Sequence, residues 1–265
     1  MKICSIIAGF AAALALHGAA LAEIVVSPLR QVITAEHEAA VYQISNPSNR
    51  IVDGKVSWVD LIATDTGYAP AEAADRSRLS AAPWLVVEPA FFRLEPGGRA
   101  EIKVRLKTGD APPPGERRSH LLIETDAART PIRKAGGGLE VDVGLGLSTP
   151  VLLRGAGGPP LVSFGQTRLL RDKNGLLELE TELLRTGAFS SFGGLVAEMK
   201  SGRKTTIVAR LDNLAIHADA SRRKISLPLK TELLPAGLLT IRYEGGAEYE
   251  GEIFAAKTFE IAEPK

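Results

Sequence analysis

The stretch Leu139-Glu140-Val141-Asp142-Val143-Gly144-Leu145-Gly146-Leu147 is the most regular in the chain. Its odd positions are all Val or Leu, and its even positions are charged residues or glycine. This alternation predicts a β-strand with one apolar face, because successive side chains of a strand point to opposite sides. The strand could be an ordinary member of a sandwich, with this face in the core, or an edge strand that accepts a partner strand. Both interpretations fit the pattern.

Short alternating segments occur along the rest of the chain. Turns rich in Pro, Gly and Asn, such as 46–49, 95–98 and 111–115, separate them at the spacing typical of β-sandwiches. The segment 177–183 alternates Leu or Thr with Glu, which predicts one buried face and one solvated face. We find no convincing pattern for a long helix, so the expected fold class is all-β.

The length of 265 residues allows one large domain or two of ordinary size. Residues 155–160 read Gly-Ala-Gly-Gly-Pro-Pro, with no apolar side chain larger than alanine, and we interpret them as a hinge. The expected organisation is therefore an N-terminal sandwich at 23–154 and a C-terminal sandwich at 161–265.

Residues 1–22 have the features of a secretory signal peptide. Lys2 precedes an apolar stretch at 6–16, and Ala-Leu-Ala at 20–22 forms a small-residue cleavage site. The apolar stretch is too short to span a bilayer, so the mature chain is expected to be exported without an integral membrane segment. Cys4 is the only cysteine, which excludes disulfides and Cys-based zinc sites from the mature chain.

Removal of the signal peptide takes Lys2 from 32 basic residues and leaves 31, against 31 acidic ones. A net charge near zero argues against a nucleic-acid partner. The mature histidines, His37, His120 and His217, are too far apart in sequence to indicate a metal site. Glu178 and Glu180 fit a solvated strand face better than a catalytic pair. The sequence therefore predicts no enzyme, no cofactor and no metal.

Several stretches, taken in order after the signal peptide, resemble the periplasmic chaperones of the chaperone-usher pilus pathway, the family of the P-pilus chaperone. The resemblance extends over essentially the whole mature chain. The matching stretches are Ser-Pro-Leu-Arg-Gln-Val-Ile at 27–33, Ile-Ser-Asn-Pro at 44–47, Pro-Ala-Phe-Phe-Arg-Leu-Glu-Pro-Gly-Gly at 89–98, Arg-Ser-His-Leu at 118–121, the alternating strand that ends at Arg154, and Arg-Thr-Gly at 185–187.

The resemblance implies two immunoglobulin-like sandwiches in an angled, boomerang-like arrangement. Such chaperones bind pilin subunits that lack their last strand, lend one of their own strands, and deliver the subunits to an outer-membrane usher. Counted back from the end of the alternating strand, the lending positions are Val141, Val143 and Leu145, with Leu139 and Leu147 as flanking candidates. The expected location is the periplasm.

In this family an Arg and a Lys hold the carboxylate at the end of the subunit. Arg30 matches the Arg, but the Lys position falls on Pro150, which has no side-chain donor. Either Arg30 is the single anchor, or a cation such as Arg118 replaces the Lys. Residues 148–151, Ser-Thr-Pro-Val, look closer to the archaic branch of the family.

The family also has an ion pair between its two domains. Arg154 matches the basic member, and Glu244 is the most plausible acidic partner by its place in the penultimate strand. The family's third, acidic member falls on Arg118, so the network in this chain must differ.

An exported two-sandwich protein could instead be an adhesive or structural surface protein. Secretion and the β pattern suit both functions. The alternating strand beside a long glycine-containing loop favours the chaperone, and it also makes self-association through that strand conceivable.

Overall fold

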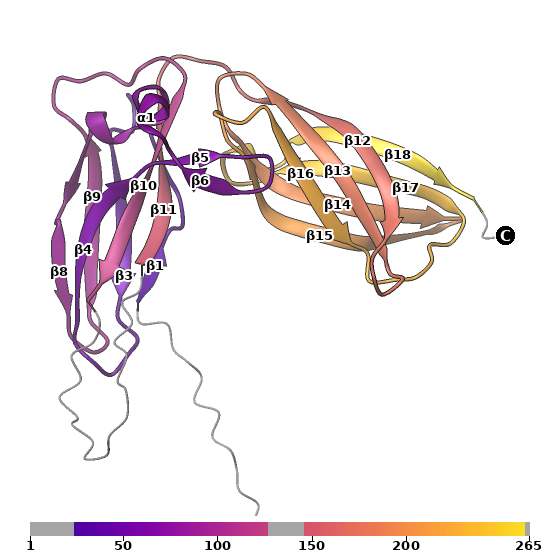
Figure 1. Cartoon of the computed structure of the whole chain (residues 1–265), viewed down its shortest axis with the longest axis horizontal. Helices are drawn as coiled ribbons and strands as arrows, with labels where there is room; N and C mark the ends of the chain where they lie inside the picture. Colours follow the sequence, from indigo (N-terminus) through magenta and orange to yellow (C-terminus); the bar gives the residue numbers. More distant parts are fainter. Residues whose placement is uncertain (1–23, 127–145, 263–265) are drawn as a thin grey trace, which may run out of the picture.

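The computed structural model describes residues 24–126 and 146–262. These residues form two β-sandwich domains set at an angle to one another (Figure 1). The all-β class with two immunoglobulin-like sandwiches is thereby confirmed. The predicted signal peptide and the lending positions Leu139, Val141, Val143 and Leu145 lie outside the described residues.

Domain 1 consists of two facing sheets, in the strand orders β1-β3-β9-β7 and β2-β11-β10-β4-β8. A hairpin and two short helices complete it. The strands are β1 (Val25–Ser27), β2 (Gln31–Ile33), β3 (Ala39–Ser45), β4 (Val52–Val59), β7 (Leu85–Glu88), β8 (Phe91–Leu94), β9 (Arg99–Leu106), β10 (Glu116–Thr125) and β11 (Gly146–Arg154). The hairpin strands are β5 (Leu61–Ala63) and β6 (Tyr68–Pro70), and the helices are α1 (Ala73–Leu79) and η1 (Ala82–Trp84).

The first strand of domain 1 changes sheet halfway along its length. β1 pairs antiparallel with β3, whereas β2 pairs in parallel with β11 at Val151, Leu152 and Leu153. The predicted alternation continues into β11, where Val151 and Leu153 are fully buried and Leu147 packs against the same core. Arg30, just before β2, is thereby placed beside the last strand of the domain.

Asn46 joins two motifs that lie far apart in the sequence. Its buried side-chain amide donates hydrogen bonds to the carbonyls of Arg50, Leu94 and Glu95. Its backbone exchanges two hydrogen bonds with the turn at Gly97 and Gly98. The Asn-Pro and Glu-Pro-Gly-Gly stretches therefore form one end of the sandwich together.

Domain 2 also has two sheets, in the orders β12-β13-β16 and β15-β14-β17-β18. Along β13 the side chains of Leu177, Leu179, Thr181 and Leu183 are buried, which confirms the alternation read from the sequence. The elements are β12 (Leu161–Arg171), β13 (Leu177–Thr186), β14 (Ser191–Ser201), β15 (Lys204–Ile216), β16 (Arg222–Pro228), β17 (Gly237–Gly245), η2 (Ala247–Tyr249) and β18 (Ile253–Ile261).

The connection between the domains is short and tied to domain 1. β11 ends at Arg154 and β12 begins at Leu161. Gly155 donates its N–H to the carbonyl of Gly115, whose own N–H bonds the carbonyl of Ala156. A side chain at Gly155 would clash with backbone oxygens of the proline loop before β10, so glycine is required there. In the described part of the chain, no helix is long and apolar enough to cross a membrane.

The Asn46→Ala substitution is expected to destabilise domain 1 by about 2–3 kcal/mol, because three buried or partly buried carbonyls lose their donor. Urea unfolding followed by tryptophan fluorescence measures the change. Asn49→Ala, which alters an exposed residue of the same turn, is the matched control and should leave the unfolding midpoint unchanged. Equal midpoints for both variants would refute the structural role of Asn46.

Candidate functional site

A small apolar cluster, separate from the core of either domain, lies where the two domains meet. Leu152 of β11 packs with Phe192 of β14 and Tyr249 of η2, and all three are buried. Val32, next to Leu152 in the parallel pairing, also contacts the cluster. This cluster is the apolar part of the joint between the domains.

An ion network lies beside the cluster. The Nε of Arg154 is 2.8 Å from Oε2 of Glu116, and its NH1 is 3.0 Å from Oε1 of Glu248. Glu116 is directly opposite Arg154 in the antiparallel register of β10 and β11, and its side chain is only 1% exposed. Ser190 of domain 2 donates both its N–H and its hydroxyl to the Glu116 carboxylate. Arg154 and Glu116 therefore connect both domains.

The predicted pairing of Arg154 with Glu244 is wrong. Glu244 forms ion pairs with Arg242 and Arg210 within its own sheet of domain 2. The acidic partner from domain 2 is Glu248, which the turn after β17 carries to Arg154. Sequence reasoning chose the right segment but missed the turn that brings a later glutamate to the joint.

Arg30 also belongs to this joint. Its NH2 is 2.9 Å from Oε2 of Glu248, and its guanidinium lies 3.4 Å from the ring centroid of Phe192. Burial lowers the pKa of Arg30, and the Glu248 carboxylate opposes that shift. Burial also acts to lower the pKa of Arg154, but Glu116, together with Tyr249 and Glu248, outweighs burial and the net pKa is raised. Both guanidinium groups remain cationic.

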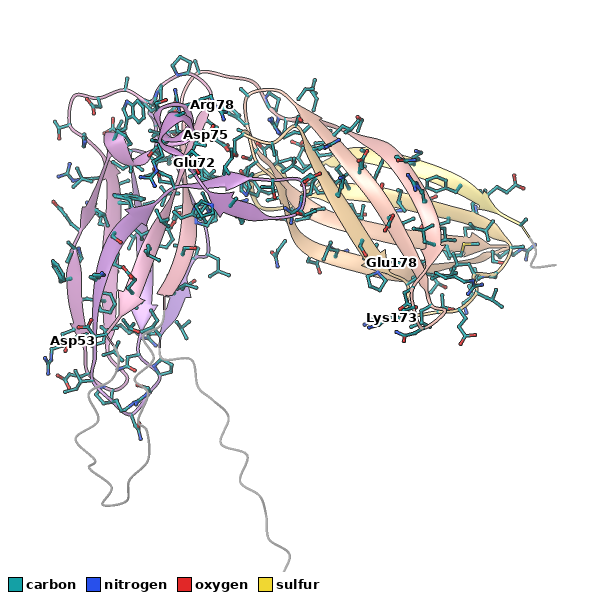
Figure 2. The ribbon with its side chains drawn as sticks, in the orientation of Figure 1. Asp53, Glu72, Asp75, Arg78, Lys173 and Glu178 are labelled. Carbon is teal, nitrogen blue, oxygen red and sulfur yellow. The ribbon has the colours of Figure 1, made fainter. Side chains whose placement is uncertain are left out.

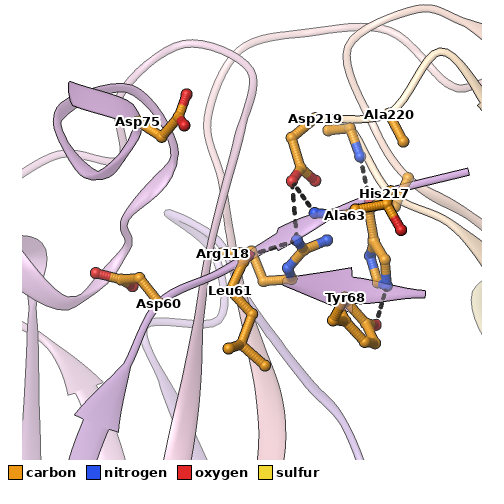
Figure 3. A network of polar contacts seen from close by, with 12 residues as sticks. Asp60, Leu61, Ala63, Tyr68, Asp75, Arg118, His217, Asp219 and Ala220 are labelled. Atoms are coloured by element: carbon orange, nitrogen blue, oxygen red, sulfur yellow. Dashed lines mark hydrogen bonds and ion pairs between the residues drawn. The ribbon is translucent and has the colours of Figure 1, made fainter. Parts of the chain in front are cut away.

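A second part of the joint is the β5–β6 hairpin, which reaches from domain 1 to domain 2 (Figures 1 and 3). At its tip the carbonyl of Asp65 accepts the N–H of Lys224, and the carboxylate of Asp65 lies 2.9 Å from the Lys224 ammonium. The N–H of Ala63 donates to Oδ2 of Asp219 at 2.7 Å. One backbone–backbone hydrogen bond, one hydrogen bond from a backbone N–H to a carboxylate, and ion pairs of Asp65 with Lys224 and Arg222 thus hold the hairpin on domain 2.

Beneath the hairpin, Arg118 forms a buried ion pair with Asp219 at 3.0 Å. The same guanidinium donates to the carbonyl of Leu61, and its side chain is 4% exposed. These contacts hold Arg118 inside the joint. Arg118 is therefore not available to replace the lysine that the resembled family has at the position of Pro150. The carbonyl at Pro150 accepts the hydroxyl of Tyr42, so this position is also used within domain 1.

Two histidines complete the contact under the hairpin. The hydroxyl of Tyr68 is hydrogen-bonded to Nε2 of His217 across the domain boundary (Figure 3). The Tyr68 ring also meets the ring of His120 edge-on. Burial, reinforced by Arg118, lowers the pKa of His120 to about 4. Burial and Arg118 also lower the pKa of His217 well below its usual value. Both imidazoles are neutral at pH 7.

Arg185 fixes the end of domain 2 that faces the joint. Its Arg-Thr-Gly stretch was noted in the sequence without a structural role. The buried guanidinium donates to the carbonyls of Thr186, Gly187, Phe189, His217, Ala218 and Ala220. These carbonyls belong to the two loops that carry Ser190 and Asp219, so Arg185 positions both.

The N-terminal half of β11 has a free side. β10 pairs along the whole of β11, but the partner on the other side, β2, reaches only from Val151 to Leu153. Within the described residues no strand pairs with that side of β11 at 146–150. This open edge continues directly from the alternating segment 139–145.

Of the two glutamates weighed as a catalytic pair, Glu180 lines a pocket with Thr66 of the hairpin and Lys224, whereas Glu178 lies elsewhere. Glu178 is near the opposite end of domain 2 (Figure 2). In residues 24–126 and 146–262, no group of three His, Cys, Asp or Glu side chains could hold a metal ion. The joint and the open edge are therefore the features that we consider as a functional site.

No protein-family model matches the chain, and no curated protein matches it. Several solved chaperone structures resemble it. The YadV chaperone is 10% identical, with a TM-score of 0.49 over 91% of this chain and 100% of the other. A second similar structure is a CsuC–CsuE chaperone–tip subunit pre-assembly complex from the archaic chaperone-usher Csu pili of Acinetobacter baumannii. The matched chain is 12% identical, with a TM-score of 0.48 over 92% of this chain and 100% of the other. In the complex of Salmonella enterica SafA pilin with the SafB chaperone, the matched chain is 15% identical, with a TM-score of 0.46 over 90% of this chain and 96% of the other.

The Arg154→Ala substitution is expected to lower stability by about 3–5 kcal/mol and to loosen the domain angle, because it leaves the buried Glu116 carboxylate unpaired. Small-angle scattering should show a larger radius of gyration. Arg210→Ala, at an exposed ion pair of domain 2, is the control and should scatter as the wild type does. Identical curves for all three proteins would contradict the locking role of Arg154.

Stability should fall on acidification, because both buried histidines have lowered pKa values in the folded chain. The contribution of the neutral histidines to the free energy of unfolding is complete above about pH 6.5, the ordinary pKa of histidine, and is lost as the pH falls toward about 4. For His120 this contribution is on the order of 3 kcal/mol. Urea unfolding at about pH 7 and about pH 5 measures it.

Replacing His120 and His217 together by Asn should flatten this dependence, whereas His37→Asn at an exposed site should not change it. An unchanged slope in the double variant would show that the two histidines are not its source.

Proposed function

We propose that this chain is a periplasmic chaperone of the chaperone-usher type, which binds pilin-type subunits by lending them a strand. Residues 1–22 would be its signal peptide, 23–154 and 161–265 its two domains, and 155–160 their hinge. The observation that carries the proposal is the open edge of β11 at 146–150, which directly follows the alternating segment 139–145 in the sequence.

The apolar positions of that segment continue, in the sequence, the alternation of the core positions of β11. Leu147, Val151 and Leu153 lie on the same side of the alternation and pack in the core of domain 1. Val141, Val143 and Leu145 share this parity, so they would offer a partner the same kind of face that β11 offers its own domain. A subunit that lacks its last strand needs such a face together with unpaired backbone groups.

The energy of such binding is sufficient without a nucleotide. Each buried Val or Leu contributes roughly 1.5–3 kcal/mol, so three lending residues contribute about 5–9 kcal/mol before the cost of ordering is subtracted. The contacts between the domains support the proposal, because they are made at the Arg154 end of β11 and leave the edge at 146–150 unpaired. Arg30 would anchor the carboxylate of the subunit, and an outer-membrane usher would receive the complex.

The Val143→Asp variant is expected to fold but to lose its subunit, because the carboxylate would enter an apolar groove unpaired. Co-expression with candidate secreted subunits, followed by affinity purification and mass spectrometry, should give at least about tenfold less complex than the wild type. Gly144→Asp is the control, since it adds the same charge at a polar position of the alternation and should keep the complex.

Equal recovery of subunits with both variants would contradict strand lending. Recovery of the chain alone, assembled on the outer surface, would instead support an adhesive or structural protein.

A further inference from the structure

One carboxylate, that of Glu248, is held by two guanidinium groups of the other domain. Its Oε2 is 2.9 Å from NH2 of Arg30, and its Oε1 is 3.0 Å from NH1 of Arg154. Each oxygen thus has its own arginine. This is how two cationic donors would hold the carboxylate of a separate molecule.

The two arginines differ in how many carboxylates they bind. Arg154 is 10% exposed and also pairs with the buried Glu116. Arg30 is 20% exposed, and within the described chain its only ion-pair partner is Glu248, which is itself 29% exposed. The contact of Arg30 with the Phe192 ring does not involve Glu248. The bond between Arg30 and Glu248 is therefore the part that an incoming carboxylate can replace.

The pair of arginines also has more donors than Glu248 satisfies. NH2 of Arg154 is buried and has no hydrogen-bond partner within the described residues. A buried donor without a partner costs free energy, so an additional acceptor at this place would be favourable.

The turn that carries Glu248 is bent toward the arginines. Ala247, the residue before it, has φ of 56°, a left-handed conformation that is unfavourable for a residue with a side chain. Tyr249, the residue after it, is buried in the apolar cluster of the joint and donates its hydroxyl to the carbonyl of Ser190. The cluster thus fixes the turn, and the turn presents Glu248 to the arginines.

We propose that Glu248 is an internal ligand that occupies Arg30 in the free chain and gives it up to the carboxylate of a bound partner. For a chain-terminal carboxylate of a subunit, this rests on the proposed function. Glu248 stays paired with Arg154 during the exchange, so the domains remain joined. The affinity for the incoming carboxylate is consequently set by competition with Glu248.

The test uses acetate as the carboxylate probe and the mature wild-type chain. Nuclear magnetic resonance of the arginine Nε–H groups follows Arg30 and Arg154 during the titration. In the Glu248→Gln variant, acetate should shift the Arg30 signal at about a tenfold lower concentration than in the wild type. Glu244→Gln removes the same charge from a nearby glutamate that does not contact Arg30, and it should behave as the wild type does.

Equal acetate dependence in wild type and Glu248→Gln, or no Arg30 shift in either, would overturn the proposal. Circular dichroism of the variant checks that it is folded. A double-mutant cycle between Arg30→Gln and Glu248→Gln in urea unfolding gives a second readout, and zero coupling would also overturn it. Neither measurement involves a subunit, so failure to capture a subunit would count against the proposed function alone.

Discussion

The arrangement of the two domains depends on the guanidinium of Arg154 between two carboxylates, Glu116 and Glu248. Glu116 is almost completely buried, and an unpaired carboxylate at such a place would be strongly destabilising. Its partners come from both domains, because Arg154 lies opposite it in domain 1 and Ser190 donates to it from domain 2. Arg154 balances the charge of Glu116 within domain 1, and Ser190 adds hydrogen bonds to the same carboxylate from domain 2, so this one group links the two domains.

The β5–β6 hairpin, whose Tyr68 bonds His217 of domain 2, is a second contact that fixes the position of the two domains. Ser190, which binds Glu116, also accepts the N–H of Ala218 next to His217, so the ion network and the hairpin contact are continuous. Two connected contacts oppose rotation of one domain against the other better than one does. β11 enters this joint at Arg154 and leaves its free edge at the opposite end, so the joint and the edge are parts of one strand.

Alternation predicted the buried and solvated faces of strands such as β13, because a period of two follows directly from strand geometry. The joint was less predictable. Arg154 was chosen correctly, but its partners Glu116 and Glu248 depend on a strand register and on a left-handed residue at Ala247. Neither has a signature in a single sequence. The helix α1 was missed because seven residues are too few for a clear helical period.

The most direct test of strand lending is hydrogen exchange, followed by mass spectrometry, of the mature chain free and in complex with a co-purified secreted subunit. If the strand is lent, amides at 139–148 exchange at least about tenfold more slowly in the complex, while those of the hairpin at 61–70 do not change. Protection confined to other surfaces, with 139–148 exchanging as in the free chain, would contradict strand lending.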